Sequence, residues 1–385
     1  MNRKRIYFAW CLVAAVCLGS CSKYPELKPQ SQASYLRVFN SLNYTQGTGG
    51  LPPNEMTLLI DPVMDKNGLP VDAAVVGDYI TERDPFSSSY PAHAGNIAVT
   101  KQSEWPGSLP VLTAPTINGL DLSAWAQVPS GKHRIMLMGR QSADTPFNHL
   151  PASARTSVIA DTTVTFTPGE VYTMEAVVFD FATVRTGAYL RNENFTKIPF
   201  STRENYLSFY CLTAANMSPN GGNGAFDPPL YLSYSLWSPL CTNSSYTGIT
   251  KYSCVWPAPV VNHVYLRTIS NSFGSAAPYD SLPMPPLSDF LNPDNSFVDS
   301  NYRPFPEFDI ADGRTGTSPL YIGVSPDLGG YPFGGGFTFP QGLAIAASNS
   351  QQIMVYPSVN IIELVNGTAY LMQLHRTFDP PIISN

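Results

Sequence analysis

Charged residues are scarce in this sequence, since Asp, Glu, Lys and Arg together make up 13% of its 385 residues. The 22 Lys and Arg are outnumbered by 28 Asp and Glu, so the formal net charge is −6. Apart from a short N-terminal cluster there is no basic stretch of the kind that neutralises phosphates. We therefore predict no nucleic-acid partner.

Histidine and recognisable catalytic motifs are also scarce. The sequence has no HExxH, no GxSxG, no Walker loop and no complete GxGxxG. The acidic run Asp289–Asn301 offers oxygen ligands that calcium prefers, but its spacing differs from an EF-hand and turn chemistry explains the same residues. We predict no cofactor, no bound metal and no enzymatic activity, and a hydrolase built from dispersed carboxylates is the least favoured alternative. The five histidines are scattered: His93, His133, His149, His263 and His375.

Long apolar runs are limited to one, Ile6–Leu18, which directly follows the basic residues 3–5. At about 13 residues it is shorter than the roughly 20 that a membrane-spanning helix needs, and it has the layout of a secretion signal. It ends in Leu18-Gly19-Ser20-Cys21, which resembles the lipobox of bacterial lipoproteins. The resemblance implies that residues 1–20 are removed and that Cys21 carries a lipid anchor in the membrane.

Ser22, rather than Asp, follows this cysteine, which by resemblance to lipoprotein sorting favours the outer membrane. The alternative is an ordinary secreted protein cut after Ser20. In the lipoprotein reading three cysteines leave with the signal or carry the lipid: Cys11, Cys17 and Cys21.

Three cysteines then remain. Cys241 and Cys254 flank a polar segment, and an oxidising envelope permits a disulfide between them, although both could equally stay reduced. Cys211 lies in the apolar stretch Tyr206–Leu212 and is predicted to be a buried thiol that packs as a small hydrophobe.

Proline and aromatic residues are abundant, with 36 Pro, 28 Gly, 21 Tyr and 20 Phe. This composition favours short strands joined by many turns. Together with the chain length it predicts an all-β fold of two tandem β-sandwich modules, at residues 34–201 and 202–385, after a tether at residues 21–33. The clearest candidate strands are Tyr35–Asn40, His133–Met138, Thr163–Thr167, Val171–Phe179 and Tyr206–Cys211.

Two weak internal echoes suggest a duplicated module. Tyr206–Cys211 repeats the outline of Tyr35–Asn40, and Ala369–Gln373 shares a Tyr-x-Met core with Val171–Glu175. Each member of the second pair follows a turn.

Those two turns have clear chemistry. Pro168-Gly169 fits a type II turn and is expected to join Thr163–Thr167 and Val171–Phe179 as a paired hairpin. Asn366-Gly367 is a favoured two-residue hairpin turn.

Two stretches look like long loops, residues 61–110 and 270–340, and long loops inside compact domains are often functional. Several aromatic residues in or near the second stretch, or beside Cys241 and Cys254, could bind sugars or a protein partner, or could fold back into a small core. These candidate binding aromatics are Trp237, Trp256, Tyr331, Phe333 and Phe337.

Four segments carry a family resemblance: Leu36–Asn40, Gly131-Lys132-His133, Pro168–Thr173 and Glu204–Tyr210. In this order after a lipobox they resemble Bacteroidota cell-envelope lipoproteins with an immunoglobulin-like domain of unknown function. The resemblance implies immunoglobulin-like sandwiches and an envelope location, but no reaction.

We therefore expect a surface-anchored, non-enzymatic binding or adhesion module whose partner is a glycan or an envelope protein. The alternative is a structural subunit or anchor of a fimbria-like fibre, for which Arg37 in the first predicted strand is a conceivable cleavage point.

Overall fold

The structure is a computed structural model, and all statements below concern the parts of the chain that it describes. These are residues 29–42, 55–83, 86–88, 103–107, 109–140, 145–201, 204–215, 230–237, 240–246, 249–255, 261–270, 272–283, 305–311, 320–323, 344–346, 353–355, 358–366 and 368–375.

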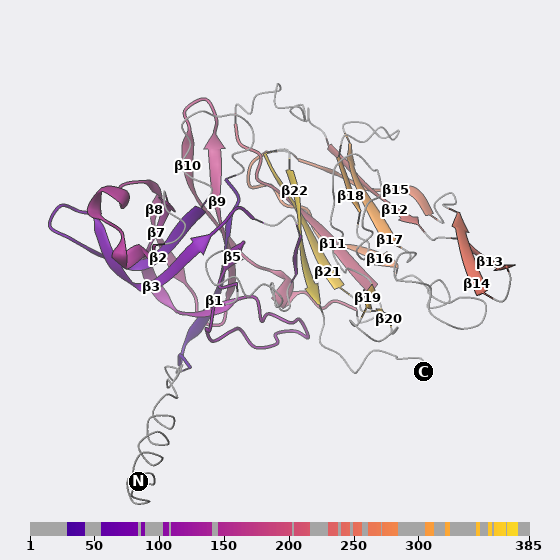
Figure 1. The fold of residues 1–385 in the computed structure, drawn as a ribbon, viewed down its shortest axis with the longest axis horizontal. Helices are drawn as coiled ribbons and strands as arrows, with labels where there is room; N and C mark the ends of the chain where they lie inside the picture. The colour runs from indigo at the N-terminus through magenta and orange to yellow at the C-terminus, as the bar shows by residue number, and fades with distance from the viewer. Residues whose placement is uncertain are drawn as a thin grey trace, which may run out of the picture.

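The protein is all-β, as the sequence predicted, and four larger sheets follow one another across the molecule (Figure 1). Sheet A has the order β10-β9-β1-β5, with β6 also pairing β1. Its strands are β1 (Ala33–Asn40), β5 (Glu104–Trp105), β6 (Ala126–Pro129), β9 (Val171–Asp180) and β10 (Arg185–Asn192). Sheet B has the order β3-β2-β7-β8. Its strands are β2 (Glu55–Met64), β3 (Pro70–Ile80), β7 (Gly131–Arg140) and β8 (Val158–Phe166).

The other two large sheets are formed mainly by the second half of the chain. Sheet C has the order β16-β11-β21-β22-β4. Its strands are β4 (Phe86–Ser88), β11 (Glu204–Cys211), β16 (Asp280–Pro283), β21 (Ser358–Val365) and β22 (Thr368–His375). Sheet D has the order β15-β12-β17-β18. Its strands are β12 (Leu230–Trp237), β15 (Val261–Ile269), β17 (Phe305–Ala311) and β18 (Leu320–Gly323).

Smaller elements complete the described chain. Two hairpins form separate two-stranded sheets: β13 (Leu240–Tyr246) with β14 (Ile249–Val255), and β19 (Ala344–Ala346) with β20 (Ile353–Val355). The helices in the described part are single 3-10 turns: η2 (Phe147–His149), η3 (Ala152–Ala154) and η4 (Phe195–Lys197). None of the described helices is long and apolar enough to cross a bilayer.

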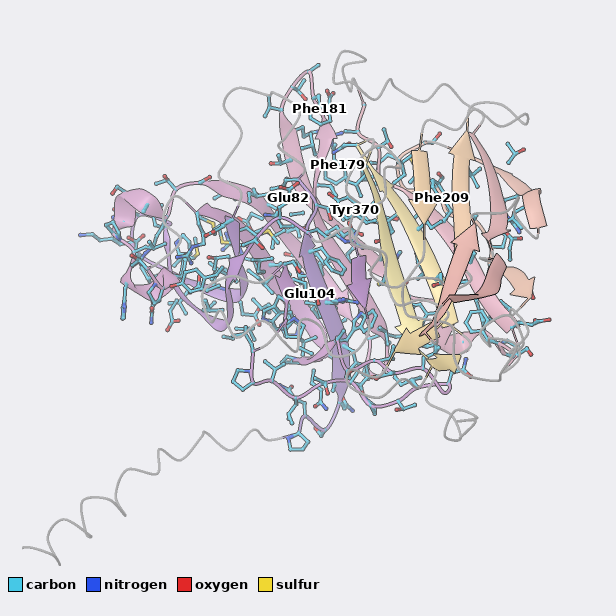
Figure 2. The ribbon with its side chains drawn as sticks, turned by 45° about the vertical axis from the view of Figure 1, so that its right-hand side comes forward. Glu82, Glu104, Phe179, Phe181, Phe209 and Tyr370 are labelled. Carbon is cyan, nitrogen blue, oxygen red and sulfur yellow. The ribbon has the colours of Figure 1, made fainter. Side chains whose placement is uncertain are left out.

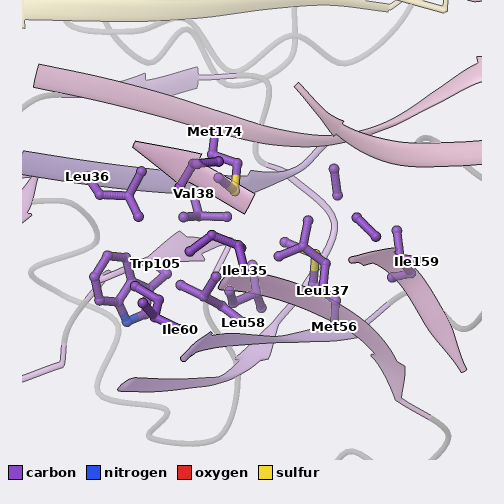
Figure 3. Packing of buried hydrophobic residues seen from close by; sticks show 14 of the residues in the cluster. Leu36, Val38, Met56, Leu58, Ile60, Trp105, Ile135, Leu137, Ile159 and Met174 are labelled. Carbon is purple, nitrogen blue, oxygen red and sulfur yellow. The ribbon is translucent and has the colours of Figure 1, made fainter. Parts of the chain in front are cut away.

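Sheets A and B enclose the main hydrophobic core (Figure 3). Leu36 and Val38 of β1 pack against Leu58 of β2 and Leu137 of β7, and all four side chains are fully buried. Leu36 and Val38 are two residues apart, and alternate side chains of a strand point to the same face of a sheet, so both reach this core. Arg37, the residue between them, must therefore face the other way.

That opposite face of sheet A is also buried, against sheet C. In β9 every residue from Val171 to Val178 is buried, and the two faces belong to different cores. Met174 packs toward sheet B, whereas Val171 packs in a cluster with Ile361 of β21 and Met372 of β22. The near-continuous apolar run of this strand predicts burial on both faces. The strand is buried in this way because sheet A lies between sheets B and C.

The pairing order of sheets A and B recurs in sheets C and D. β1 runs parallel to β9, which pairs antiparallel with β10, and β11 runs parallel to β21, which pairs antiparallel with β22. Likewise β2 pairs with β3 and β7, while β12 pairs with β15 and β17. The first predicted echo, between Tyr35–Asn40 and Tyr206–Cys211, joins the equivalent strands β1 and β11. This recurrence supports a duplication, while the module boundary at residue 201 stays a prediction.

The second echo was wrong. Val171–Glu175 lies in β9 and Ala369–Gln373 in β22, but the sheet order makes β21 the counterpart of β9. The shared Tyr-x-Met pattern therefore does not mark equivalent strands, because β9 and β22 have different positions in their sheets.

The Pro168-Gly169 turn has the predicted local geometry but not the predicted role. Gly169 has φ of 78° and the Glu170 N–H donates to the Thr167 carbonyl at 3.1 Å. However, β8 pairs with β7 in sheet B, and β9 pairs with β1 and β10 in sheet A. The turn thus carries the chain between sheets, so the predicted hairpin was wrong. The Asn366-Gly367 hairpin is confirmed, because β21 and β22 pair up to Val365 and Thr368.

Other predictions on chain organisation had mixed outcomes. The predicted loop at residues 61–110 contains β3, which pairs with β2 along most of its length, so much of it is sheet. Strands β16, β17 and β18 likewise lie within residues 270–340. The first strand of the described chain, β1, begins at Ala33, one residue before the predicted start at Ser34.

Candidate functional site

Five buried ionisable residues meet where sheets A and C pack, and we call them the inter-sheet charge network: Arg83, Glu175, Arg191, Glu193 and Glu363. Arg83 donates through Nη1 to Glu175 Oε2 at 3.1 Å and through Nη2 to Glu363 Oε2. Arg191 donates through Nε to Glu193 Oε1 at 2.8 Å and also contacts Glu363. Each arginine therefore links carboxylates, and Glu363 of sheet C is held by both arginines.

The strand registers explain why two glutamates face each other here. In sheet A, Glu175 of β9 lies opposite Phe39 of β1 and Tyr189 of β10. In sheet C, Glu363 of β21 lies opposite Tyr210 of β11 and Tyr370 of β22. The two glutamates thus occupy equivalent positions in the repeated strand order, each with an aromatic residue on both sides.

Arg83 reaches the network from the segment that follows β3. Its own N–H donates to the Asn40 carbonyl at 2.8 Å, which fixes this segment to the end of β1. A few residues later β4 pairs in parallel with β22 at the edge of sheet C. Figure 2 shows Glu82, the neighbour of Arg83, near Tyr370 in the region where the two sheets meet. Arg83 and β4, both from the first half of the chain, therefore contact sheet C, which is formed mainly by the second half.

Aromatic rings cover the guanidinium groups. The Arg83 guanidinium carbon lies 4.0 Å from the centroid of the Phe39 ring and 4.8 Å from that of Tyr370. The Arg191 guanidinium lies 4.2 Å from the Tyr210 ring centroid. These rings exclude water and add cation–π attraction, which is strongest for a desolvated cation.

A second buried pair lies beside the network. Arg37 of β1 donates through Nε to Glu104 Oε2 of β5 at 2.6 Å, and both side chains are fully buried. The Arg37 guanidinium also lies 4.9 Å from the Trp125 ring centroid. Burial lowers the pKa of Arg37 despite the opposing effect of Glu104. Figure 2 places Glu104 on sheet A. This pair ties the short strand β5 to the centre of the sheet.

The network has three carboxyl groups for two guanidinium groups, so it carries a formal charge of −1 when all five are ionised. Burial, and then the neighbouring Glu363 carboxylate, raise the pKa of Glu175 to about 7. Burial opposes ionisation of Glu363 as well, but the Arg191 and Arg83 guanidinium groups lower its pKa overall. A proton on Glu175 leaves two cations and two anions in contact, which is the neutral arrangement that a desolvated interior favours.

The arrangement is suited to holding sheets together rather than to turnover. All five side chains lie inside the protein, where no substrate could reach them, and each glutamate contacts at least one arginine of the network. Within the described residues no group of three or more His, Cys, Asp or Glu is arranged to hold a metal ion.

The network was not predicted from the sequence, although a signal was present. Glu175 and Glu363 each interrupt an apolar strand, in Val171–Val178 and in Val359–Val365, at a position where a charge must be buried. Buried charges need partners, so an isolated glutamate in such a strand indicates a matching arginine elsewhere in the chain.

Predicted site residues fall into two groups. Cys241 and Cys254 lie directly opposite each other in the β13–β14 hairpin, and Trp237 ends β12 opposite Phe305. The remaining predicted site residues lie outside the described residues: Cys21, Trp256, Tyr331, Phe333 and Phe337. The acidic run Asp289–Asn301 also lies outside them.

Two residues singled out in the sequence have structural roles. His133 of β7 places Nδ1 2.6 Å from Asp61 Oδ2, and its ring stacks on Phe166 at 5.9 Å between centroids. Cys211 is buried at the end of β11, where burial raises the pKa of its thiol. Both agree with the structural interpretation of these residues.

Comparison with known proteins finds similarity to solved structures. No family model matches the sequence, and no curated protein matches it significantly. Similar solved structures include a "putative cell adhesion protein" from Bacteroides uniformis, at 7% identity and a TM-score of 0.19, with 91% of this chain and 100% of that chain covered. Another of that description, from Bacteroides ovatus, has 8% identity and a TM-score of 0.19, with 92% and 100% covered. Superpositions with such low TM-scores transfer neither a fold nor an activity.

Proposed function

We propose that the mature chain is a lipid-anchored, non-enzymatic binding or adhesion module of the cell envelope, held to the outer membrane through Cys21. The observation that carries this proposal is the short distance in sequence between the lipobox and the first strand of the β body. β1 begins at Ala33, so residues 22–32 can span at most about 40 Å when fully extended. An anchored chain would hold its sheets close to the membrane surface.

The use of charged groups inside the protein supports a binding role. Three buried glutamates and two buried arginines among the described residues are paired with each other where sheets A and C pack. Such pairing favours a rigid scaffold. A rigid scaffold suits a protein that presents loops and hairpins to a partner.

The β13–β14 hairpin is the element best placed to contact that partner. Within the described chain it pairs with no other strand, and it lies at the far end of the molecule from sheet B (Figure 1). Its segment from residues 242 to 253, TNSSYTGITKYS, is rich in hydroxyl groups and has two tyrosines. Tyrosine, serine and asparagine are the residue types that antibody loops use for polar surfaces, and tyrosine rings stack on sugars. A glycan is therefore the preferred ligand class, with an envelope protein as the other.

Binding by the purified full chain tests this proposal. We expect retention of specific glycans on an array, and we expect a variant with Tyr246→Ala and Tyr252→Ala to lose at least tenfold in affinity. The matched control is Tyr189→Ala, a tyrosine of sheet A that lies far from the hairpin in sequence. Binding to extracted envelope protein instead of glycan would select the second ligand class, and silence against both would contradict the proposal.

One observation favours the alternative of a fibre subunit. β1 lies between β9 on one side and β5 and β6 on the other, so its removal would open a slot that a neighbour's strand could fill. Arg37, however, is fully buried within β1, so cleavage there requires β1 to leave the sheet first. Detergent-resistant ladders of the envelope protein, together with a new N-terminus after Arg37, would favour this alternative.

A further inference from the structure

The β13–β14 hairpin aligns the two cysteines that flank residues 242–253. The register of the seven paired positions runs from Leu240 and Val255 to Tyr246 and Ile249, and it sets Cys241 opposite Cys254. Directly opposite residues of an antiparallel pair have their side chains on the same face, with Cα atoms about 4.5 to 5.5 Å apart. A disulfide needs Cα atoms about 4.4 to 6.8 Å apart, so this backbone spacing is suitable.

The type of pair is also favourable. Two residues connect Tyr246 and Ile249, and two-residue hairpin turns are closed by hydrogen bonds between the residues that flank them. Hydrogen-bonded and non-hydrogen-bonded pairs alternate along an antiparallel ladder. Cys241 and Cys254 form the fifth pair beyond the closing pair. They therefore occupy a non-hydrogen-bonded pair, the type in which the Cα atoms lie closer, at about 4.5 Å.

We propose that Cys241 and Cys254 form an intrachain disulfide that braces the β13–β14 hairpin. Formation removes two protons and two electrons from the thiols, and a disulfide-bearing oxidant accepts the electrons. One cysteine thiolate attacks the oxidant and releases its first thiol. The second cysteine thiolate then attacks the mixed disulfide, forms the S–S bond and releases the oxidant's second thiol.

Cys211 does not compete for either cysteine. It lies in β11 of sheet C, in a different sheet from the hairpin, and is fully buried. Burial raises the pKa of its thiol, which lowers the fraction of reactive thiolate. The odd cysteine of the mature chain therefore stays a thiol.

The bond has a structural purpose in this position. A two-stranded hairpin is marginally stable alone, and within the described chain β13 and β14 form a sheet without a third strand. A covalent link near the base of the hairpin restricts the unfolded alternatives of the 242–253 segment. The hairpin can then keep a fixed shape without a third strand paired to it.

Peptide mapping of the full-length protein tests the proposal. Cells are treated with N-ethylmaleimide at harvest, and the protein is purified from the envelope and digested without reductant. Trypsin cuts after Lys251, between the two cysteines, and chymotrypsin then separates Cys211 from Cys241. We expect a linked pair of peptides containing Cys241 and Cys254, with Cys211 alkylated after denaturation. A Cys211→Ser variant should keep the linked pair, and a Cys241→Ser variant should leave Cys254 alkylated.

A second arm separates the geometry from the cellular location. The reduced, purified protein is incubated in a mixture of reduced and oxidised glutathione and mapped in the same way. Pairing in this buffer but not in cells would support the hairpin geometry and count against an oxidising location, and hence against the proposed function. Failure to pair in the buffer, or a link that includes Cys211, would overturn the disulfide.

Discussion

Replacement of Arg83 by methionine probes the contact between sheets A and C. The substitution keeps an apolar stem against Phe39 but removes the guanidinium group that contacts both Glu175 and Glu363. Two buried carboxyl groups then face each other with one arginine fewer. Removal of one partner from a buried pair typically costs about 3 to 5 kcal/mol, and we expect Arg83→Met to lower the unfolding free energy by this amount.

The matched control is an exposed arginine with comparable hydrogen bonding. Arg134 donates to Asp161 through Nε at 2.9 Å and Nη2 at 2.7 Å, but the two side chains are 43% and 39% exposed. Solvent screens such pairs, so Arg134→Met should cost about 1 kcal/mol or less.

Denaturant unfolding followed by tryptophan fluorescence measures both variants, and hydrogen exchange at the amides of β9 and β21 locates the effect. A triple variant that adds Glu175→Gln and Glu363→Gln should recover part of the loss, because it removes the unpaired charges. Equal stability of the Arg83→Met and Arg134→Met variants would refute the argument that the network holds the two sheets together.

Three further changes test other parts of the structure. Because folding raises the pKa of Glu175 from 4.5 to about 7, the stability that this group contributes is full below pH 4.5 and is lost as the pH rises through 7. Denaturant unfolding of the wild type between pH 5 and 8 should show this loss of stability. A Glu175→Gln variant that loses as much stability over the same pH range would exclude Glu175 as the cause. A Cβ at Gly77 would lie 2.5 Å from Trp105 Cδ1, so Gly77→Ala should cost about 1 to 3 kcal/mol in thermal unfolding, and an unchanged midpoint would show that the indole can move. Asn366 has φ of 48° and its side chain accepts a hydrogen bond from the Ala214 N–H at 2.8 Å, so Asn366→Ala should destabilise more than Asn366→Gly, and the reverse order would contradict the role of backbone conformation.

The strands and turns were accessible from the sequence because their signals are local. Tyr35–Asn40 and Tyr206–Cys211 are aromatic and branched, and both became strands of inner sheets. Gly169 adopts the left-handed conformation that its turn predicted. Local preference fixes the bend of the chain there, but it does not say which strand will lie alongside.

The layer order could not be predicted, because it depends on contacts between distant residues. Arg83 and Glu363 are separated by 280 positions, and nothing in either local sequence names the other. The pairing of β9 with β1 is also a non-local property. The Pro168-Gly169 turn has the local geometry of a hairpin turn, yet it connects β8 of sheet B to β9 of sheet A. The sequence indicated Cys241 and Cys254 as a candidate pair, whereas their position directly opposite each other is known only from the register of the hairpin.

The anchor is tested most directly by replacing Cys21 with serine and comparing membrane association with that of the wild type. Fractionation with detergent phase separation should place the wild-type protein with the membrane lipids and release the Cys21→Ser protein into the aqueous phase, with its β-sheet circular dichroism unchanged. Equal retention of both proteins with the lipids would contradict a lipid anchor at this residue.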